Sequence, residues 1–110
     1  MNAATWQEDD SKMTIELEHL GRGRFLLSGR ADVTNVGRLL ADGREQFICQ
    51  DDISIDLEQS DCSNTAGLAL LIEWSTWCQS YGIKLIYRRA PEDLLEIVRI
   101  NDVAEVLTFS

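Results

Sequence analysis

The amino-acid sequence predicts a single α/β domain with a mixed, mostly parallel sheet of about five strands and three to four helices. Three observations support this prediction. Short segments in which apolar and polar residues alternate are separated by longer segments with apolar residues at helical spacing. Two strands come first and helix–strand alternations follow, and strands joined through a helix run parallel. The chain of 110 residues is long enough for one core and too short for two.

The first two predicted strands form an antiparallel hairpin at an edge of the sheet. Residues 13–19 alternate apolar Met13, Ile15 and Leu17 with polar residues, which indicates a strand with one buried face. The Gly-Arg-Gly turn at 21–23 separates this strand from a second one over 24–28.

A first helix is predicted over 33–47, with Asp32 as its N-cap. Its helically spaced apolar residues are Val33, Val36, Leu39, Leu40 and Phe47. Gly37 and Gly43 each weaken an isolated helix by about 1 kcal/mol. Packing against the rest of the domain must therefore hold this helix in place.

The alternation over 53–57 indicates a central strand, and a long second helix follows it. Ser63 or Asn64 caps the start of this helix, which runs to about Tyr81, and Gly82 stands where a left-handed stop is expected.

The last predicted elements are a strand over 83–87, a third helix and a closing strand. Pro91 stands at the first position of the third helix, because proline is tolerated there. The apolar residues of this helix are Leu94, Leu95, Ile97, Val98 and Ile100. Residues 106–109 are the candidate for a strand that closes the sheet.

Composition indicates an acidic domain after a polar leader. Apart from Trp6, residues 1–11 show no periodicity, so we assign 1–11 to the leader and 12–110 to the domain. The net charge of −9 argues against nucleic-acid binding. The longest apolar run, 68–72, is far shorter than the roughly 20 residues of a membrane span. Three cysteines without a Cys-x-x-Cys pair fit reduced thiols, so we expect a cytoplasmic protein.

The sequence lacks the patterns that enzyme active sites require. It contains neither a glycine-rich phosphate loop nor a nucleophile elbow. Cys62 and His19 remain as a candidate catalytic pair, although no residue is placed to orient that histidine. Since His19 is also the only imidazole that accompanies the cysteines, we expect no metal site, no cofactor and no catalysis.

The segment 60–67 links the central strand to the second helix, a position where ligands and partners bind in α/β sheets. Thr65 would present its hydroxyl beside the positive end of the helix dipole. The alternative is that Ser63, Asn64 and Thr65 only cap the helix. Gly67, one turn inside, indicates close approach of another backbone, from a neighbouring strand or a partner.

A projection of the second helix at about 100° per residue places its core-facing residues on one broad arc. The arc contains Ala66, Leu70, Leu71, Trp74, Trp77, Cys78 and Tyr81. Leu68 and Ile72 fall outside it. Two explanations stay open for them: coverage by the first helix, or a surface on which a partner docks.

Four motifs, in this order, resemble those of a STAS domain over residues 13–109. They are Leu27-Ser28-Gly29-Arg30-Ala31-Asp32-Val33-Thr34, Ile53-Ser54-Ile55-Asp56-Leu57, Asn64-Thr65-Ala66-Gly67-Leu68-Ala69-Leu70-Leu71 and Tyr81-Gly82-Ile83-Lys84-Leu85. The resemblance implies a small sheet flanked by helices and regulation through protein contact.

Two branches of that family differ in the loop before the second helix. Anti-sigma-factor antagonists carry Asp-Ser-Ser-Gly there, and a partner kinase phosphorylates the second serine. The matching residues here are 64–67, so Ala66 stands at the phosphoacceptor position. The MlaB-like subunit of the Mla lipid ABC transporter carries a threonine, a small residue and Gly-Leu-Ala-Leu-Leu, which Thr65, Ala66 and residues 67–71 match. Glu73-Trp74 also resembles that branch.

The MlaB-like resemblance gives the main prediction of function. It implies a non-catalytic adaptor that binds the cytosolic ATPase of a phospholipid-transporting ABC complex and is recruited to the inner membrane through it. That complex maintains outer-membrane lipid asymmetry. The alternative is an anti-sigma-factor antagonist that binds an anti-sigma-factor kinase, with Thr65 or Ser63 as the phosphorylation site. The predicted partner-binding residues are Ser63, Asn64, Thr65, Ala66, Leu68 and Ile72.

Overall fold

The computed structural model describes residues 15–110. The predicted leader at 1–11 with its Trp6, and Met13 of the first predicted strand, lie outside the described residues.

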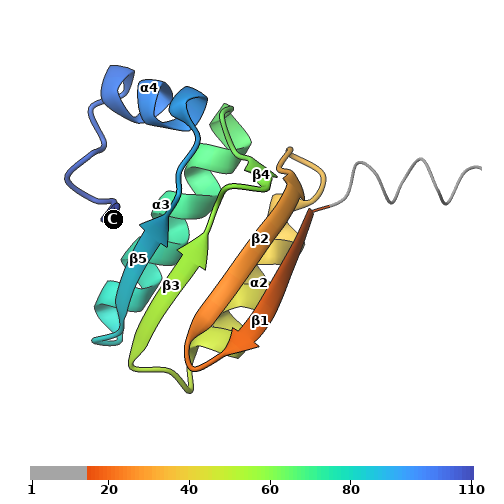
Figure 1. Cartoon of the computed structure of the whole chain (residues 1–110), viewed down its shortest axis with the longest axis vertical. Coiled ribbons are helices and arrows are strands. Elements are labelled where there is room, and N and C mark those ends of the chain that lie inside the picture. The colour runs from red at the N-terminus through yellow and green to blue at the C-terminus, as the bar shows by residue number, and fades with distance from the viewer. Residues whose placement is uncertain (1–14) are drawn as a thin grey trace, which may run out of the picture.

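The sheet is mixed and mostly parallel, as the sequence predicts (Figure 1). Strands β1 (Ile15–Gly21) and β2 (Arg24–Arg30) form the antiparallel hairpin, with β1 at the edge. On its other side β2 pairs in parallel with β3 (Asp52–Asp56), and β3 pairs in parallel with β5 (Lys84–Arg88). The carboxyl ends of β2, β3 and β5 therefore meet at one end of the sheet.

A short fifth strand, β4 (Ser60–Asp61), pairs in parallel with the carboxyl end of β2. It resumes the pairing with β2 after a turn at 57–59, in which the Ser60 N–H donates to the Leu57 carbonyl over 3.0 Å. The sequence does not predict β4, because a strand of this length has no periodicity.

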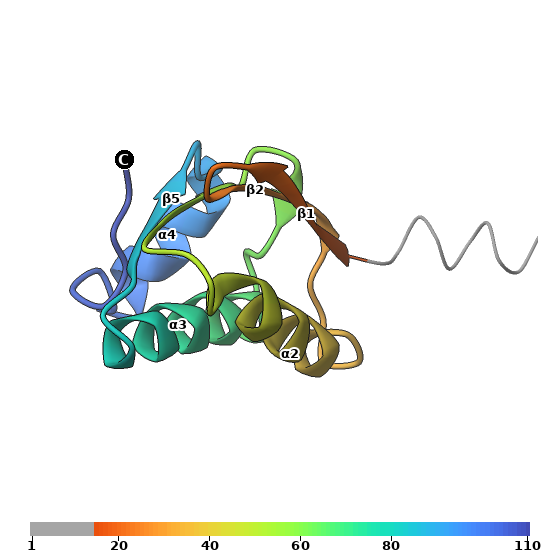
Figure 2. The ribbon, with the colours of Figure 1, turned by 90° about the horizontal axis from the view of Figure 1, so that it is seen from below.

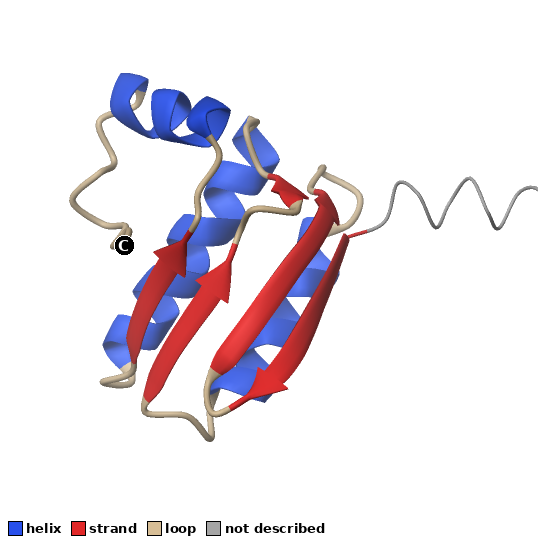
Figure 3. Ribbon diagram, in the orientation of Figure 1, coloured by secondary structure: helices blue, strands red, loops and turns tan. Residues whose placement is uncertain are grey.

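Helices α2 (Val36–Phe47) and α3 (Thr65–Ser80) lie side by side on one face of the sheet (Figure 2). Within the described chain no helix lies over the opposite face, which is turned to the viewer in Figure 3. The shorter α4 (Glu92–Ile100) lies at the end where the parallel strands point. The described part of the chain thus contains three helices, within the predicted three to four.

The core lies between the sheet and the pair α2–α3. Phe47 of α2 packs edge to face between Phe25 of β2 and Trp74 of α3, with ring centroids 5.2 and 5.4 Å apart. Gly43 lets the helices approach closely, because a Cβ at that position would overlap the Trp74 indole. This contact explains a glycine that is unfavourable for an isolated helix.

The first and third helices begin later than predicted. Helix α2 begins at Val36, because residues 33–35 form a turn in which the Asp32 side chain accepts the Thr34 N–H. Val33 is therefore no core residue, and its side chain is 84% exposed. Pro91 precedes α4 as its N-cap, because its ψ of 153° is extended and not helical.

The predicted closing strand is reduced to a single parallel bridge between Phe109 and Tyr87. The projection of α3 is wrong at both ends. Leu68 is buried, with 8% of its surface exposed, while Tyr81 is 59% exposed. Helix α3 packs against α2, β5 and α4, so its buried sector is wider than one arc. Tyr81 lies at the C-cap, where the helix ends.

Candidate functional site

Two loops meet at the carboxyl end of the parallel strands. One follows β2 and contains residues 31–35, and the other follows β4 and contains residues 62–64. Backbone pairing holds them together, since the Ala31 N–H donates to the Asp61 carbonyl over 3.0 Å. Residues about 30 positions apart thus form one surface at the end of an α/β sheet where ligands and partners bind.

The first loop is held rigid by its own polar side chains. Asn35, which is buried, accepts the Asp32 N–H over 2.9 Å and donates to the Arg30 carbonyl over 3.0 Å. The Asp32 carboxylate accepts the N–H of Thr34 over 2.8 Å and its hydroxyl as well. These hydrogen bonds, that of the Thr34 hydroxyl above all, hold the pKa of Asp32 below its usual value. Asp32 is therefore charged at neutral pH and fixes the turn that carries Val33.

The second loop is fixed by Asn64 and Asp61. The Asn64 side-chain oxygen accepts the Gly67 N–H over 2.8 Å and so caps α3, while its NH2 group donates to the Ala31 carbonyl over 2.9 Å. The Asp61 carboxylate accepts the hydroxyl of Ser63 over 2.7 Å and its N–H over 3.2 Å. The hydroxyl contact is the main cause that lowers the pKa of Asp61.

Gly67 allows the second loop to lie against the first turn of α3. A Cβ on Gly67 would lie 2.5 Å from the Cα and 2.7 Å from the carbonyl oxygen of Cys62. Both are backbone atoms, so neither can rotate away. The close backbone predicted from Gly67 is therefore that of the loop before its own helix.

Thr65 and Ala66 complete a shallow cavity of about 500 Å³ between the two loops. Its lining, which we call the loop surface, consists of Arg30, Ala31, Asp32, Val33, Asn64, Thr65 and Ala66. Thr65 is the first residue of α3 and is exposed, and its hydroxyl has no hydrogen-bond partner among residues 15–110. The loop surface thus presents a free hydroxyl beside an exposed apolar side chain.

The structure places the six predicted partner-binding residues in different settings. Thr65 and Ala66 lie on the loop surface. Asn64 lies there too, but both ends of its amide are used inside the protein, as the capping alternative expects. The Ser63 hydroxyl is bonded to Asp61. Leu68 belongs to the core and Ile72 is half-buried against it, so neither lines the cavity of the loop surface.

Sequence reasoning missed Val33 as a surface residue. Its apolar side chain fits the helical spacing of Val36 and Leu39, and that spacing assigned it to the core. The signal that points the other way is Asp32-Val33-Thr34-Asn35, since Asp and Asn favour turns that use their own side chains.

The candidate catalytic pair is not supported by the geometry. Cys62 is buried, and burial raises the pKa of its thiol to about 11, so little thiolate forms at neutral pH. His19 lies on the edge strand β1, where its ring stacks on Phe25 with centroids 4.4 Å apart. Among residues 15–110 no group of acidic, histidine and cysteine side chains could hold a metal ion. The helices of this part of the chain are also too short or too polar to cross a membrane.

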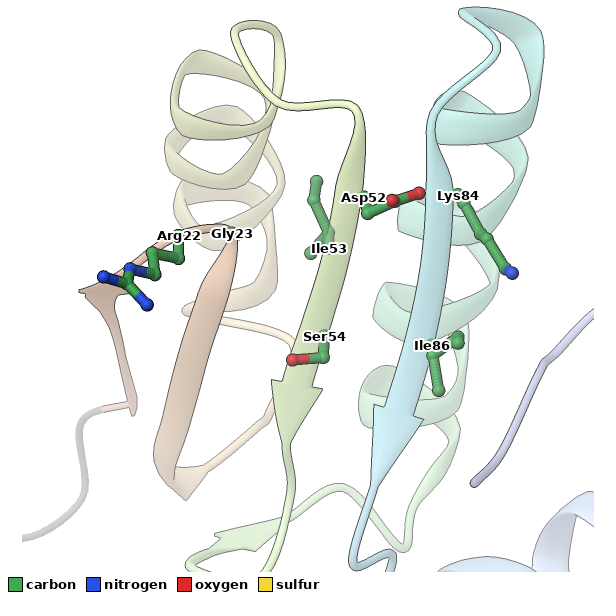
Figure 4. Close-up of a pocket in the computed structure, with 7 residues that line it drawn as sticks. All are labelled: Arg22, Gly23, Asp52, Ile53, Ser54, Lys84 and Ile86. Atoms are coloured by element: carbon green, nitrogen blue, oxygen red, sulfur yellow. The ribbon is translucent and has the colours of Figure 1, made fainter.

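A second cavity, of about 260 Å³, lies on the open face of the sheet (Figure 4). It is lined by Arg22, Gly23, Asp52, Ile53, Ser54, Lys84 and Ile86. The charged ends of Arg22 and Lys84 lie on opposite sides of it and point away from each other. Polar groups that do not converge do not define a ligand site.

Comparison with known proteins identifies the fold. No protein-family model and no curated protein matches the sequence. The structure of the anti-sigma factor antagonist SpoIIAA in its unphosphorylated form is 13% identical, with a TM-score of 0.63 over 88% of each chain. That of the Bacillus cell fate determinant SpoIIAA in the phosphorylated form is 12% identical, with a TM-score of 0.63 over 88% of this chain and 91% of the other. The chain has the STAS fold.

Proposed function

We propose that this protein acts without catalysis, by docking its loop surface on a partner protein. The observation that carries the proposal is Thr65, whose exposed hydroxyl has no partner among the described residues and stands on a rigid support. Asn64 fixes the backbone beside it through two hydrogen bonds. A surface ordered before binding loses little conformational entropy when a partner arrives.

The similarity in fold to SpoIIAA supports an anti-sigma-factor antagonist whose partner is an anti-sigma-factor kinase. In that function Thr65 is the better phosphorylation site. A phosphate on Thr65 would lie at the start of α3, where backbone N–H groups and the helix dipole favour negative charge. A phosphate on Ser63 would break its bond to Asp61 and face that carboxylate.

The local sequence supports the other partner, the cytosolic ATPase of a phospholipid-transporting ABC complex. Thr65, Ala66 and residues 67–71 match the pattern of MlaB-like subunits, and Ala66 stands where antagonists carry their phosphorylated serine. In that function Thr65 is a direct contact to the ATPase and needs no phosphate. The protein would then act on the cytoplasmic side of the inner membrane.

Thr65→Asp tests the docking proposal in either case. The new carboxylate stands at the helix N-terminus, where negative charge stabilises a helix by about 0.3–1 kcal/mol, so the variant should remain folded. It should bind the partner at least about tenfold more weakly, because a charge is buried in the interface without its own partner. Thr76→Asp is the matched control, since Thr76 is also exposed and lies later in α3.

The experiment uses the purified ABC-transporter ATPase and the purified anti-sigma-factor kinase of the source cell. Each is titrated with the wild type, Thr65→Asp and Thr76→Asp, and circular dichroism checks that the variants are folded. The kinase is also incubated with the wild type and ATP, and mass spectrometry locates any phosphate. If folded Thr65→Asp binds as tightly as the wild type, or if neither protein binds the wild type, the docking proposal is wrong.

A further inference from the structure

Val33 is the most exposed large apolar side chain among residues 15–110, with 84% of its surface in contact with solvent. It lies on the loop surface beside Thr65 and Ala66. Scattered apolar residues occur on every protein surface and need no explanation by themselves. Val33 differs because of the way it is held and because of its neighbours.

The turn under Val33 is built to hold its side chain outward. The Asp32 N–H donates to the Asn35 side chain, and the Asp32 carboxylate accepts the Thr34 N–H. The N–H groups of Asn35 and Val36 both donate to the Asp32 carbonyl over 3.2 Å. Asn35 also ties the turn back to the end of β2. The side chain therefore projects from a rigid support and cannot fold back onto the core.

The residues around Val33 indicate the shape and charge that a partner surface needs in order to bind here. Ala66, which is half-buried, lines the same cavity and adds apolar surface next to it. A neighbouring cavity of about 280 Å³ begins at Asp61 and Ser63, and three of its lining residues are carboxylates, Glu58, Asp61 and Asp93. Arg89 contacts Glu58 over 3.1 Å, and Arg30 approaches Asp61 only to 3.9 Å. Asp93 has no salt-bridge partner among residues 15–110, so three carboxylates face two arginines and this flank of the loop surface keeps a net negative charge.

We propose that Val33 is the apolar anchor of the docking interface, and that it inserts into a preformed apolar socket of a folded partner with basic side chains on the flank that meets Asp61 and Asp93. The inference deepens the proposed function and rests on it. A rigid single-residue projection fits a socket that already exists, since neither side then has to become ordered. Side chains that fill such sockets at the centre of an interface carry a large share of the binding free energy.

The first test measures the dissociation constant of Val33→Ala and Val33→Asp with whichever purified partner binds the wild type, the ABC-transporter ATPase or the anti-sigma-factor kinase. Val33→Ala removes two buried methyl groups and should weaken binding about tenfold. Val33→Asp should weaken it about 100-fold, because a carboxylate would enter an apolar socket. The matched controls are Val106→Ala and Val106→Asp, since Val106 is exposed and lines a different cavity, beside Lys84.

The second test reports burial directly. A polarity-sensitive dye on Val33→Cys, in a chain whose exposed Cys49 is replaced by serine, should shift its emission to the blue when the partner is added. The same dye on Val106→Cys should not shift. Cys62 and Cys78 are buried and remain unlabelled in the folded protein. Raising the salt concentration should weaken binding of the wild type, because the basic flank of the partner faces carboxylates.

The outcomes separate this inference from the proposed function. If Thr65→Asp abolishes binding while both Val33 variants bind as the wild type does, the loop surface docks without Val33 as its anchor, and the inference is wrong. Binding that does not depend on salt would refute the basic flank. If the wild type binds neither protein, the inference falls together with the proposed function.

Discussion

Replacement of Gly67 by alanine tests the contact on which the loop surface is built. In an exposed helix interior this change stabilises a protein by about 1 kcal/mol. Here the added Cβ would lie 2.5, 2.7 and 2.8 Å from three backbone atoms of Cys62. Carbon atoms in contact are normally about 3.5–4.0 Å apart, so the loop must move by roughly 1 Å. Overpacking of this kind costs about 1–3 kcal/mol, and a fixed backbone neighbour places the cost at the upper end.

The net expectation is a loss of about 2 kcal/mol for Gly67→Ala, measured by urea unfolding. With a denaturant dependence of about 2 kcal/mol per molar, the unfolding midpoint falls by about 1 M. Gly37→Ala is the matched control, because Gly37 is in a helix with no atom within 4 Å of its added Cβ. This control should gain about 0.5–1 kcal/mol. If Gly67→Ala raises the midpoint as Gly37→Ala does, the loop does not lie against α3 as described.

Two further predictions concern the polar groups that hold the site and the sheet. Asn64→Ala should lower the free energy of unfolding by about 1 kcal/mol or more, since it removes the cap of α3 and the bond to Ala31. Asn64→Asp, which keeps the capping oxygen, should recover part of this loss in the same urea titration. The Arg89 hydrogen bond lowers the pKa of Asp56, so this carboxylate stabilises the fold above its unfolded pKa of about 3.9 and loses that contribution as pH falls through the lower folded value. Asp56→Asn should therefore flatten the loss of stability as pH falls below about 4, and an unchanged acid profile would contradict this reasoning.

The order of strands and helices could be predicted because each signal is local. Alternation over 53–57 places β3, and Asn64 and Gly82 mark the two ends of α3 with a cap and a positive φ of 71°. The helix boundaries that were predicted wrongly are those where two local conformational preferences compete. Val33 continues the spacing of a helix, but the Asp32 side chain forms a turn that delays the helix to Val36.

The candidate site could be predicted only in part. The sequence places Thr65 at the start of a helix after a central strand, and that position needs no knowledge of the rest of the fold. The docking role of Leu68 and Ile72 was predicted from one helix taken alone. The structure surrounds α3 with α2, β5 and α4, and it places Leu68 in the core and Ile72 half-buried against it.

The sequence by itself determined the class of the fold, the hairpin at its edge, the capped start of α3 and the need for glycine at 67. These features depend on side chains within a few positions of one another, so they can be predicted from local stretches of the sequence. Only the tertiary structure decided that Val33 is exposed, that Leu68 is buried and that Ala31 lies beside Asn64. Each of these depends on how β2, β4 and α3 pack together, and packing between distant segments follows from the summed burial of many residues.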